Sequence, residues 1–383
     1  MGLEDVAIVG IGRTSFTRNS GRTTGAMAAE AVRDALGDAG LVAGDVDGMV
    51  SFQAGDSTPS AAVAAAVGVD DLAWSADLFG GGNVVVTTIG EAARALATGA
   101  CSVAVAYRSM NGRSGSRFGT ATEGGFAVGG EAQFGGPVGY LVPPHWMAMW
   151  AARHQHTYGS TCEDLGAIAI TQRSHAAAND HAIAQQPITL DDYLAGRWVV
   201  EPLRIFDCAY EVDGAVALVL TSTDRAADLA QPPVRIRTAV DSTSAGGSWD
   251  QWPDPTQMFS ARLAGRLWEG SGLGPGDIDV ACIYDCFTYT VMAVLEDLGF
   301  AEKGGVGELF RSGGATYGGD TVVNPHGGLL SEGYLHGMNH HFEAVLQLRG
   351  GSGARQVEDA RNALVTAGAG PYGGAIIYTT EAG

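Results

Sequence analysis

Long hydrophobic runs, basic clusters and paired cysteines are scarce in this sequence, and each shortage excludes a class of protein. No segment approaches the roughly 20 apolar residues that a membrane-spanning helix needs. The N-terminus, MGLEDVAIVGIG, carries acids where a secretory signal peptide would carry Lys or Arg. The 22 Lys and Arg face 42 Asp and Glu, and the resulting net charge of −20 argues against binding to nucleic acid or to an anionic membrane.

The five cysteines are an odd number scattered along 383 residues, which indicates free thiols in a reducing compartment. We therefore expect a globular protein of the cytoplasm. Cys282 and Cys286 lack the second cysteine pair of a structural zinc site. His336 and His340 are spaced to share one helix face, but an obvious third ligand is missing, so we expect no metal and no cofactor. No G-x-S-x-G motif is present, which leaves a hydrolase nucleophile elbow unsupported.

Glycine, in contrast, is abundant, and the most informative glycines lie between Asn324 and Gly350 in NPHGGLLSEGYLHGMNHHFEAVLQLRG. A turn opens this stretch, glycines flank Tyr334 and His336, and an apolar stripe typical of a helix begins at Met338. Polar side chains at the start of a helix lie beside unpaired backbone amides, which favour anionic groups. The pattern predicts an active-site loop; a plain connecting loop is the alternative.

The same order of glycine-rich turn, helix, terminating glycine and apolar strand is predicted for Phe79–Gly99 and the strand that follows it. We interpret the chain as a structural duplication with halves 1–229 and 230–383, joined near Leu229–Pro233. The first half contains a large insertion, about 111–211, which we predict to be a lid or binding region.

Apolar periodicity predicts an α/β protein. Helices are predicted over Thr24–Ala39, Ser60–Val67, Cys162–Ala178 and Phe259–Trp268, and strands over Asp5–Ile11, Val46–Phe52, Ser102–Tyr107, Ala215–Thr221, Val234–Val240, Val280–Tyr284, Ala363–Thr366 and Ala375–Thr379. The first strand ends in Gly-Ile-Gly, which is only a weak dinucleotide-binding signal because the third glycine of that motif is absent.

Hydroxyl and imidazole groups gather at the loop-to-helix junctions and are the candidates for chemistry. They are Tyr284, Asp285, Asn324, His326, Tyr334 and His336. Most buried tyrosines are ordinary core aromatics with a satisfied hydroxyl. Tyr284 and Tyr334 differ because one ends a strand and the other lies between glycines. With an ordinary pKa of about 10, a tyrosine serves as acid or base when neighbours stabilise phenolate or water is excluded. Such a pair suits moving one proton off a hydroxyl and delivering another to a carbanion.

Three segments resemble the thiolase superfamily, especially the branch related to the thiolase domain of sterol carrier protein x. They read GGNVVVTTIGEAARALATGACSVAVAYRS, IYDCF and VVNPHGGLLSEGYLHG followed by LQLRG. The resemblance spans nearly the whole chain and implies a duplicated αβαβα layered fold.

Departures from the thiolase pattern carry the functional information. Gly82 stands where the family has its nucleophilic cysteine, and the second thiolase cysteine is missing near Ala367. Tyr284 replaces the histidine of the His-Asp-Cys-Phe motif, and Tyr334 replaces that of Gly-His-Pro. Without a thiolate no acyl-enzyme can form, so the usual thiolytic or condensing route is excluded.

The double-tyrosine pattern resembles the steroid side-chain-cleaving aldolases. This resemblance implies retro-aldol cleavage of a steroid β-hydroxyacyl-CoA to a ketosteroid and a short acyl-CoA such as propionyl-CoA. It implies Tyr284 and Tyr334 as the proton-transfer pair, with neither assigned as acid or base. His336, Asn324 and Asp285 become candidates for polarising the thioester or orienting a tyrosine. The CoA thioester is substrate rather than cofactor.

The resemblance also implies an OB-fold partner protein of a hydratase, bound to a thiolase-like homodimer within a heterotetramer. Two other interpretations stay open at the level of sequence. One is a non-catalytic thiolase-like scaffold that binds acyl-CoA or sterol. The other is an acyltransferase that recruits a different nucleophile.

Overall fold

The computed structural model describes residues 2–115, 117, 132–140, 142–243 and 252–381. Part of the predicted insertion, at 116, 118–131 and 141, therefore lies outside the described residues, and the statements below concern the described ones.

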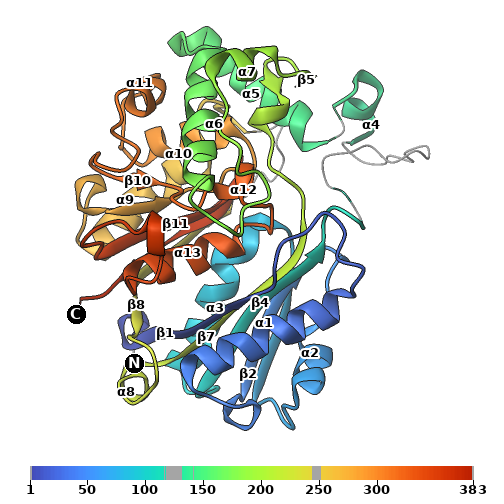
Figure 1. Ribbon diagram of the computed structural model, residues 1–383, viewed down its shortest axis with the longest axis vertical. Coiled ribbons are helices and arrows are strands. Elements are labelled where there is room, and N and C mark those ends of the chain that lie inside the picture. The colour runs from blue at the N-terminus through green and yellow to red at the C-terminus, as the bar shows by residue number, and fades with distance from the viewer. Residues whose placement is uncertain (1, 116, 118–131, 141, 244–251, 382–383) are drawn as a thin grey trace.

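The chain folds around one ten-stranded sheet to which both halves contribute (Figure 1). The first half supplies β1 (Val6–Arg13), α1 (Thr24–Ala39), β2 (Gly48–Gln53), α2 (Ser60–Val67), β3 (Trp74–Phe79), α3 (Val85–Ala97), β4 (Val103–Asn111), β7 (Asp213–Ser222) and α8 (Thr223–Ala226). The second supplies β8 (Val234–Thr243), α9 (Phe259–Ser271), β9 (Val280–Cys282), α10 (Thr288–Asp297), α11 (Val306–Arg311), β10 (Val322–Val323), α12 (Gly328–Ser331), α13 (Met338–Leu348), β11 (Asn362–Ala369) and β12 (Tyr372–Thr379).

Strand order shows that the two halves repeat one topology. The order is β10-β9-β11-β12-β8-β1-β7-β4-β2-β3, and the halves meet where β1 pairs antiparallel with β8. Moving outward from that junction, each half has two antiparallel pairings followed by two parallel pairings. The division into 1–229 and 230–383, which falls between α8 and β8, stays a prediction.

Helices cover both faces of each half-sheet and form a layered α/β architecture. Alternate residues of β4 face opposite layers: Val103, Val105 and Tyr107 pack with α1 and α2, whereas Ala104 and Ala106 face the central layer. Helices α3 and α13 make up that central layer, and α3 contacts strands of both halves. The predicted α/β class is confirmed.

Several boundaries predicted from the sequence are correct and others are not. Helices α1 and α2 have the predicted bounds. The strand predicted to end at Thr366 continues to Ala369 and forms a hairpin with β12, which begins at Tyr372 instead of the predicted Ala375. Strand β9 ends at Cys282, so Tyr284 lies beyond it. Sequence periodicity did not identify β3 or the helix α5 (Pro143–Tyr158).

Gly10 and Gly12 serve helix packing inside β1. A Cβ atom at either position would overlap the backbone carbonyl oxygen of Ala35 or Ala31 in α1. The glycines let α1 approach the strand closely, which is a common use of glycine where two backbones meet. The weak dinucleotide-binding signal therefore has a structural explanation.

The insertion between β4 and β7 packs on the other half of the molecule. Its described elements are α4 (Ala132–Gly135), α5 (Pro143–Tyr158), α6 (Cys162–Ala176), α7 (Leu190–Ala195), β5 (Trp198–Val200) and β6 (Leu203–Arg204). Helix α6 contacts α10, α11 and α12, and α5–α7 lie above the second half in Figure 1. The buried His154 of α5 lies 2.8 Å from Glu296 of α10. A lid role for this insertion stays a prediction. None of the described helices is long and apolar enough to cross a membrane.

Candidate active site

The candidate site lies where the turns before α3 and α13 meet the carboxyl-side ends of β9 and β10. Gly82 precedes α3, Tyr284 follows β9, and Tyr334 and His336 precede α13. Helix N-termini carry unpaired backbone amides and partial positive charge, so the two central helices favour negative charge at this junction.

The structure brings the two predicted tyrosines together. Their hydroxyl oxygens lie 3.0 Å apart, at hydrogen-bond distance, and their rings are tilted by 62°. Tyr284 is 3% exposed, while Tyr334 is partly exposed beside it. This geometry provides a direct path for a proton between the two phenols, and their catalytic role stays a prediction at this point.

Gly82 and Tyr284 share one space. A Cβ atom on Gly82 would overlap the hydroxyl oxygen and ring of Tyr284. Gly337 also makes room for this ring, because its Cβ would lie 3.0 Å from a Tyr284 ring carbon. The Tyr284 hydroxyl therefore occupies the position that any side chain at residue 82 would take.

Burial sets the ionisation of both tyrosines. Burial raises the pKa of Tyr284 well above its ordinary value, and the neighbouring Tyr334 raises it further. Burial also raises the pKa of Tyr334, as does Cys286, but the hydrogen bond from Tyr284 and the charge of Arg108 oppose this rise. Both side chains are neutral phenols near pH 7, and Tyr334 is the better stabilised of the two when negative charge develops.

Asn324 holds the backbone just before Tyr284. Its side-chain oxygen accepts a hydrogen bond of 2.8 Å from the Ile283 amide, and its Nδ2 donates to the Ile283 carbonyl at 2.9 Å. The Tyr284 amide donates to the Thr366 hydroxyl at 3.0 Å. Asn324 is fully buried at a φ of 50°, a left-handed conformation that asparagine tolerates. Of its two predicted roles, this geometry favours orienting a tyrosine over polarising a thioester.

The end of the insertion fastens the two tyrosine-bearing loops to each other. The Tyr334 amide donates to the Tyr210 carbonyl at 2.8 Å, and the Ala209 amide donates to the Cys286 carbonyl at 3.0 Å. Tyr210 in turn donates its amide to Leu329 at 2.9 Å. Sequence reasoning did not assign any residue of the insertion to the site, because these contacts use backbone atoms that any residue could supply.

Asp285 caps helix α12 instead of facing the tyrosine hydroxyls. Its carboxylate accepts hydrogen bonds from the amides of Leu329 and Leu330, at 2.8 and 3.1 Å, and lies 3.1 Å from Nε2 of His340. A Cβ on Gly328 would overlap this carboxylate. The contacts make Asp285 a support of the loop that carries the site.

Three buried potential ligands, Cys282, His326 and His340, have ligand atoms within 4.8 Å of one another. Hydrogen bonding explains part of this cluster, since Nδ1 of His340 lies 3.1 Å from Nε2 of His326 and its other nitrogen contacts Asp285. The helix face predicted for His336 and His340 is wrong, because His336 lies before α13 in a left-handed conformation.

His336 contacts a charged residue that sequence reasoning missed. Its Nδ1 lies 3.0 Å from Nη2 of Arg108, which also forms an ion pair with Asp56. The His336 ring lies 5.0 Å from the ring of Tyr334. The available signal was an arginine at the end of the buried segment SVAVAYRS, because a charge in such a place needs partners.

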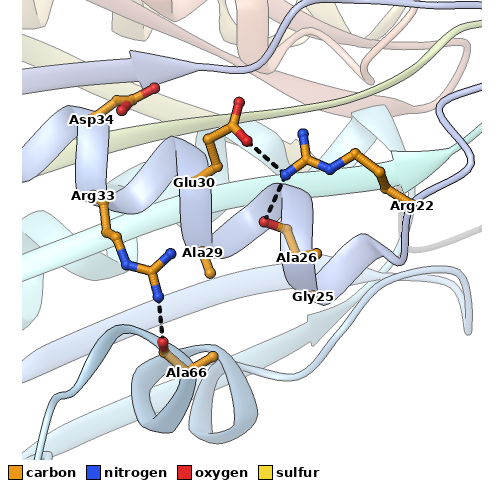
Figure 2. Close-up of a pocket in the computed structure, with 8 residues that line it drawn as sticks. All are labelled: Arg22, Gly25, Ala26, Ala29, Glu30, Arg33, Asp34 and Ala66. Atoms are coloured by element: carbon orange, nitrogen blue, oxygen red, sulfur yellow. Dashed lines mark hydrogen bonds and ion pairs between the residues drawn. The ribbon is translucent and has the colours of Figure 1, made fainter.

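A surface hollow elsewhere has no connection to this chemistry. It lies between α1 and α2, has a volume of about 480 Å³ and is lined in part by Arg22, Glu30 and Arg33 (Figure 2). Arg22 pairs with Glu30, and Arg33 donates to the Ala66 carbonyl. These paired side chains cover the outer helix layer, away from the tyrosine pair.

Comparison with known proteins gives a consistent result. A family model described as "Thiolase C-terminal domain-like" matches residues 242–379. The chain is 43% identical to a 17-hydroxy-3-oxo-4-pregnene-20-carboxyl-CoA lyase of Mycobacterium tuberculosis, with 97% of this chain and 98% of the relative covered. It is 42% identical to a steroid side-chain-cleaving aldolase of Thermomonospora curvata, with 97% of each covered.

A solved structure has the same fold along its whole length. The Ltp2-ChsH2(DUF35) aldolase superposes with a TM-score of 0.91 at 40% identity, covering 98% of both chains. The predicted duplicated thiolase-like architecture is therefore confirmed. The chain belongs to the steroid side-chain-cleaving aldolases, the carbon–carbon lyases of the thiolase superfamily.

Proposed function

We propose that this aldolase cleaves the side chain of a steroid β-hydroxyacyl-CoA by a retro-aldol reaction, releasing a ketosteroid and a short acyl-CoA such as propionyl-CoA. The observation that carries this proposal is the hydrogen-bonded Tyr284–Tyr334 pair. The Tyr284 hydroxyl fills the space that a side chain at residue 82 would occupy. The similarity to the M. tuberculosis lyase supports a steroid thioester as the substrate class.

The chemistry needs one proton to move from oxygen to carbon. The bond between the hydroxyl-bearing carbon and the α-carbon of the thioester breaks, and its electron pair passes to the α-carbon as an enolate. The hydroxyl carbon becomes the ketone, and the α-carbon takes up a proton. Such a step uses no covalent enzyme intermediate and no oxidant, so a site without a nucleophilic cysteine can perform it.

A neutral relay between the tyrosines accounts for this transfer. Tyr284 accepts the substrate hydroxyl proton while it passes its own proton across the 3.0 Å hydrogen bond to Tyr334, which delivers its proton to the α-carbon. We assign Tyr334 as the acid because Arg108 and the Tyr284 hydroxyl both lower the pKa of Tyr334 against the effect of burial. The N-termini of α3 and α13 stabilise the developing enolate.

Assembly with other chains completes the proposal. We propose an OB-fold partner protein of a hydratase, supported by the similarity to the Ltp2-ChsH2(DUF35) aldolase. We also propose a homodimer within a heterotetramer, formed through β3. This strand ends the ten-stranded sheet, and its terminal Phe79 is 86% exposed. A free sheet edge of this kind pairs readily with another strand.

Product analysis tests the function. The full chain, with its partner, is incubated in D2O with a steroid-CoA whose shortened side chain carries a tertiary β-hydroxyl, and the products are identified by mass spectrometry. We expect equal amounts of ketosteroid and short acyl-CoA, with one deuterium on the α-carbon of the latter. Binding of the thioester without cleavage would support the scaffold interpretation instead, and thiolysis of a 3-ketoacyl-CoA would point to an unrecognised nucleophile.

A further inference from the structure

Arg108 is a fully buried charge beside the site. The side chain, at 0% exposure near the end of β4, donates from Nη1 to the Phe52 carbonyl at 2.9 Å. Its Nη2 forms an ion pair with Asp56 and contacts Nδ1 of His336 at 3.0 Å. Burying a guanidinium costs several kcal/mol unless its partners are well placed, so a residue of this kind needs an explanation in structure or function.

The contact between Arg108 and His336 determines which nitrogen of the histidine carries the proton. A guanidinium has only donors, so Nδ1 of His336 must accept, and the ring proton must lie on Nε2. Burial and the charge of Arg108 both lower the pKa of His336 well below its ordinary value, while Asp56 opposes them. His336 is therefore a neutral imidazole whose Nε2 is a hydrogen-bond donor.

The donor side of His336 faces the glycine turn before α3. A Cβ on Gly81 would lie 3.5 Å from Cε1 and 3.7 Å from Nε2 of His336. The ring is fixed from other sides, because it stacks on Phe52 at an interplanar angle of 25° and meets the Tyr334 ring at 78°. The imidazole ring is thus held between the turn before α3, Phe52 and Tyr334.

We propose that Arg108, anchored by Asp56, is a positioning residue that holds His336 as the Nε2–H tautomer, so that His336 donates a hydrogen bond to the thioester oxygen of the substrate. This inference rests on the proposed retro-aldol function. The thioester oxygen becomes an enolate oxygen when the carbon–carbon bond breaks, and a preorganised donor binds the developing charge more strongly than the neutral thioester. In this role Arg108 acts through His336 and does not touch the substrate, while its charge also lowers the pKa of Tyr334.

The first test compares two substitutions of His336. In His336→Gln the side-chain amide places a donor near the Nε2 position, whereas in His336→Asn it lies near Nδ1, opposite the donors of Arg108. We expect His336→Asn to lower kcat by about 10²–10³-fold, the usual cost of one oxyanion donor. His336→Gln should keep at least ten times more activity, and KM should change little in either variant. The backbone alone would favour the opposite order of activities. The φ of residue 336 is 55°, a left-handed conformation that asparagine accepts better than glutamine. Equal activities would overturn the proposal.

The second test reads the tautomer directly in the resting enzyme. Nitrogen-15 NMR of the histidine-labelled full chain, with the His336 signals identified from the His336→Gln variant, distinguishes a protonated from an unprotonated ring nitrogen. We expect a protonated Nε2 in the wild type and in Arg108→Lys, and a mixture of tautomers in Arg108→Gln together with a lower kcat. Wild-type signals showing the proton on Nδ1 would overturn the inference.

The experiments distinguish a failure of the proposed retro-aldol function from a failure of the Arg108–His336 inference. If the wild type releases no ketosteroid, the retro-aldol assignment fails, and the thioester contact of His336 fails with it. The NMR result then still decides whether Arg108 sets the tautomer. If Arg108→Gln does not fold, the two His336 variants and the wild-type spectrum decide the question.

Discussion

The turn before α3 and the turn before α13 occupy equivalent places in the repeated topology, but their contents are opposite. Residues 80–82 are three glycines, which leave space. Residues 333–337 have glycine at both ends, and between them Tyr334 supplies a hydroxyl group and His336 an imidazole group. The two halves are complementary at this point, because the first half leaves space at Gly82 and Tyr284 of the second half fills that space.

The supporting residues show the same division. The first half contributes Arg108 and Asp56, and the second contributes the histidine that they hold. A site assembled at the junction of two repeats depends on both of them. Experiments that alter one half at a time test this dependence.

Removing either tyrosine hydroxyl should have the largest effect. Tyr284→Phe and Tyr334→Phe should each lower kcat for ketosteroid release by about 10²–10⁴-fold, the usual range for a general acid or base. The kcat of the double variant should be only slightly below that of the less active single variant, because the two hydroxyls act as one relay. Tyr289→Phe is the matched control, since that buried hydroxyl donates only to the Pro255 carbonyl in this structure. Full activity in both site variants would exclude the relay.

Adding a side chain at Gly82, in the turn before α3, should lower kcat by the next largest factor. In Gly82→Ala the new methyl group must displace the Tyr284 hydroxyl, and misplacing a catalytic group by about 1 Å can cost roughly 10²-fold. In the control Gly37→Ala, on α1 and away from the site, the methyl group would meet no atom within 4 Å. We expect kcat to fall by about that factor in the first variant and to change little in the second. Similar kcat values for the two variants would show that the absence of a side chain at Gly82 is not needed to position Tyr284.

Loosening the support of Tyr284 should have a moderate effect, mostly on stability. Asn324→Ala removes both side-chain hydrogen bonds to Ile283 and leaves buried backbone groups unpaired, at a cost of about 1–3 kcal/mol each. Asn324→Gly removes the same bonds but accepts the φ of 50°, so the difference between the variants reports backbone strain minus the extra entropy that glycine has in the unfolded chain. Thermal or urea unfolding of both variants measures these terms. A stability equal to the wild type would contradict the orienting role.

The pH dependence of kcat should show the smallest change. The pKa values of both tyrosines are raised above 10.0, so the phenols stay protonated below that pH. The pKa of His336 is lowered below 6.5, so the ring stays neutral above that pH. We therefore expect kcat to be nearly constant between these limits, provided that the substrate thioester is intact. A limb near pH 6.5 that disappears in His336→Gln would show that the pKa of His336 is close to its ordinary value and not lowered by burial and Arg108.

Local patterns in the sequence were enough for much of the fold. The apolar spacing and the stop at Gly40 predicted α1 with its observed bounds, because helix periodicity and a left-handed glycine cap are local properties. The β3 strand was missed because its residues alternate between intermediate and exposed positions at a sheet edge and carry a weak apolar signal. Asp285 was placed among candidates for substrate contact, yet its carboxylate is occupied by backbone amides of a segment distant in sequence.

The sequence shows a glycine at residue 82 and tyrosines at 284 and 334. Together with the resemblance to the thiolase superfamily, these residues argued against thiolate chemistry by the usual route and for a proton-transfer pair. The folded chain was needed to show that Gly82 and Tyr284 share one space, that the two hydroxyls lie 3.0 Å apart, and that Nδ1 of His336 faces the donors of Arg108. The physical reason is that periodicity and turn residues report on neighbours along the chain, whereas a site depends on atoms that folding brings together from distant segments.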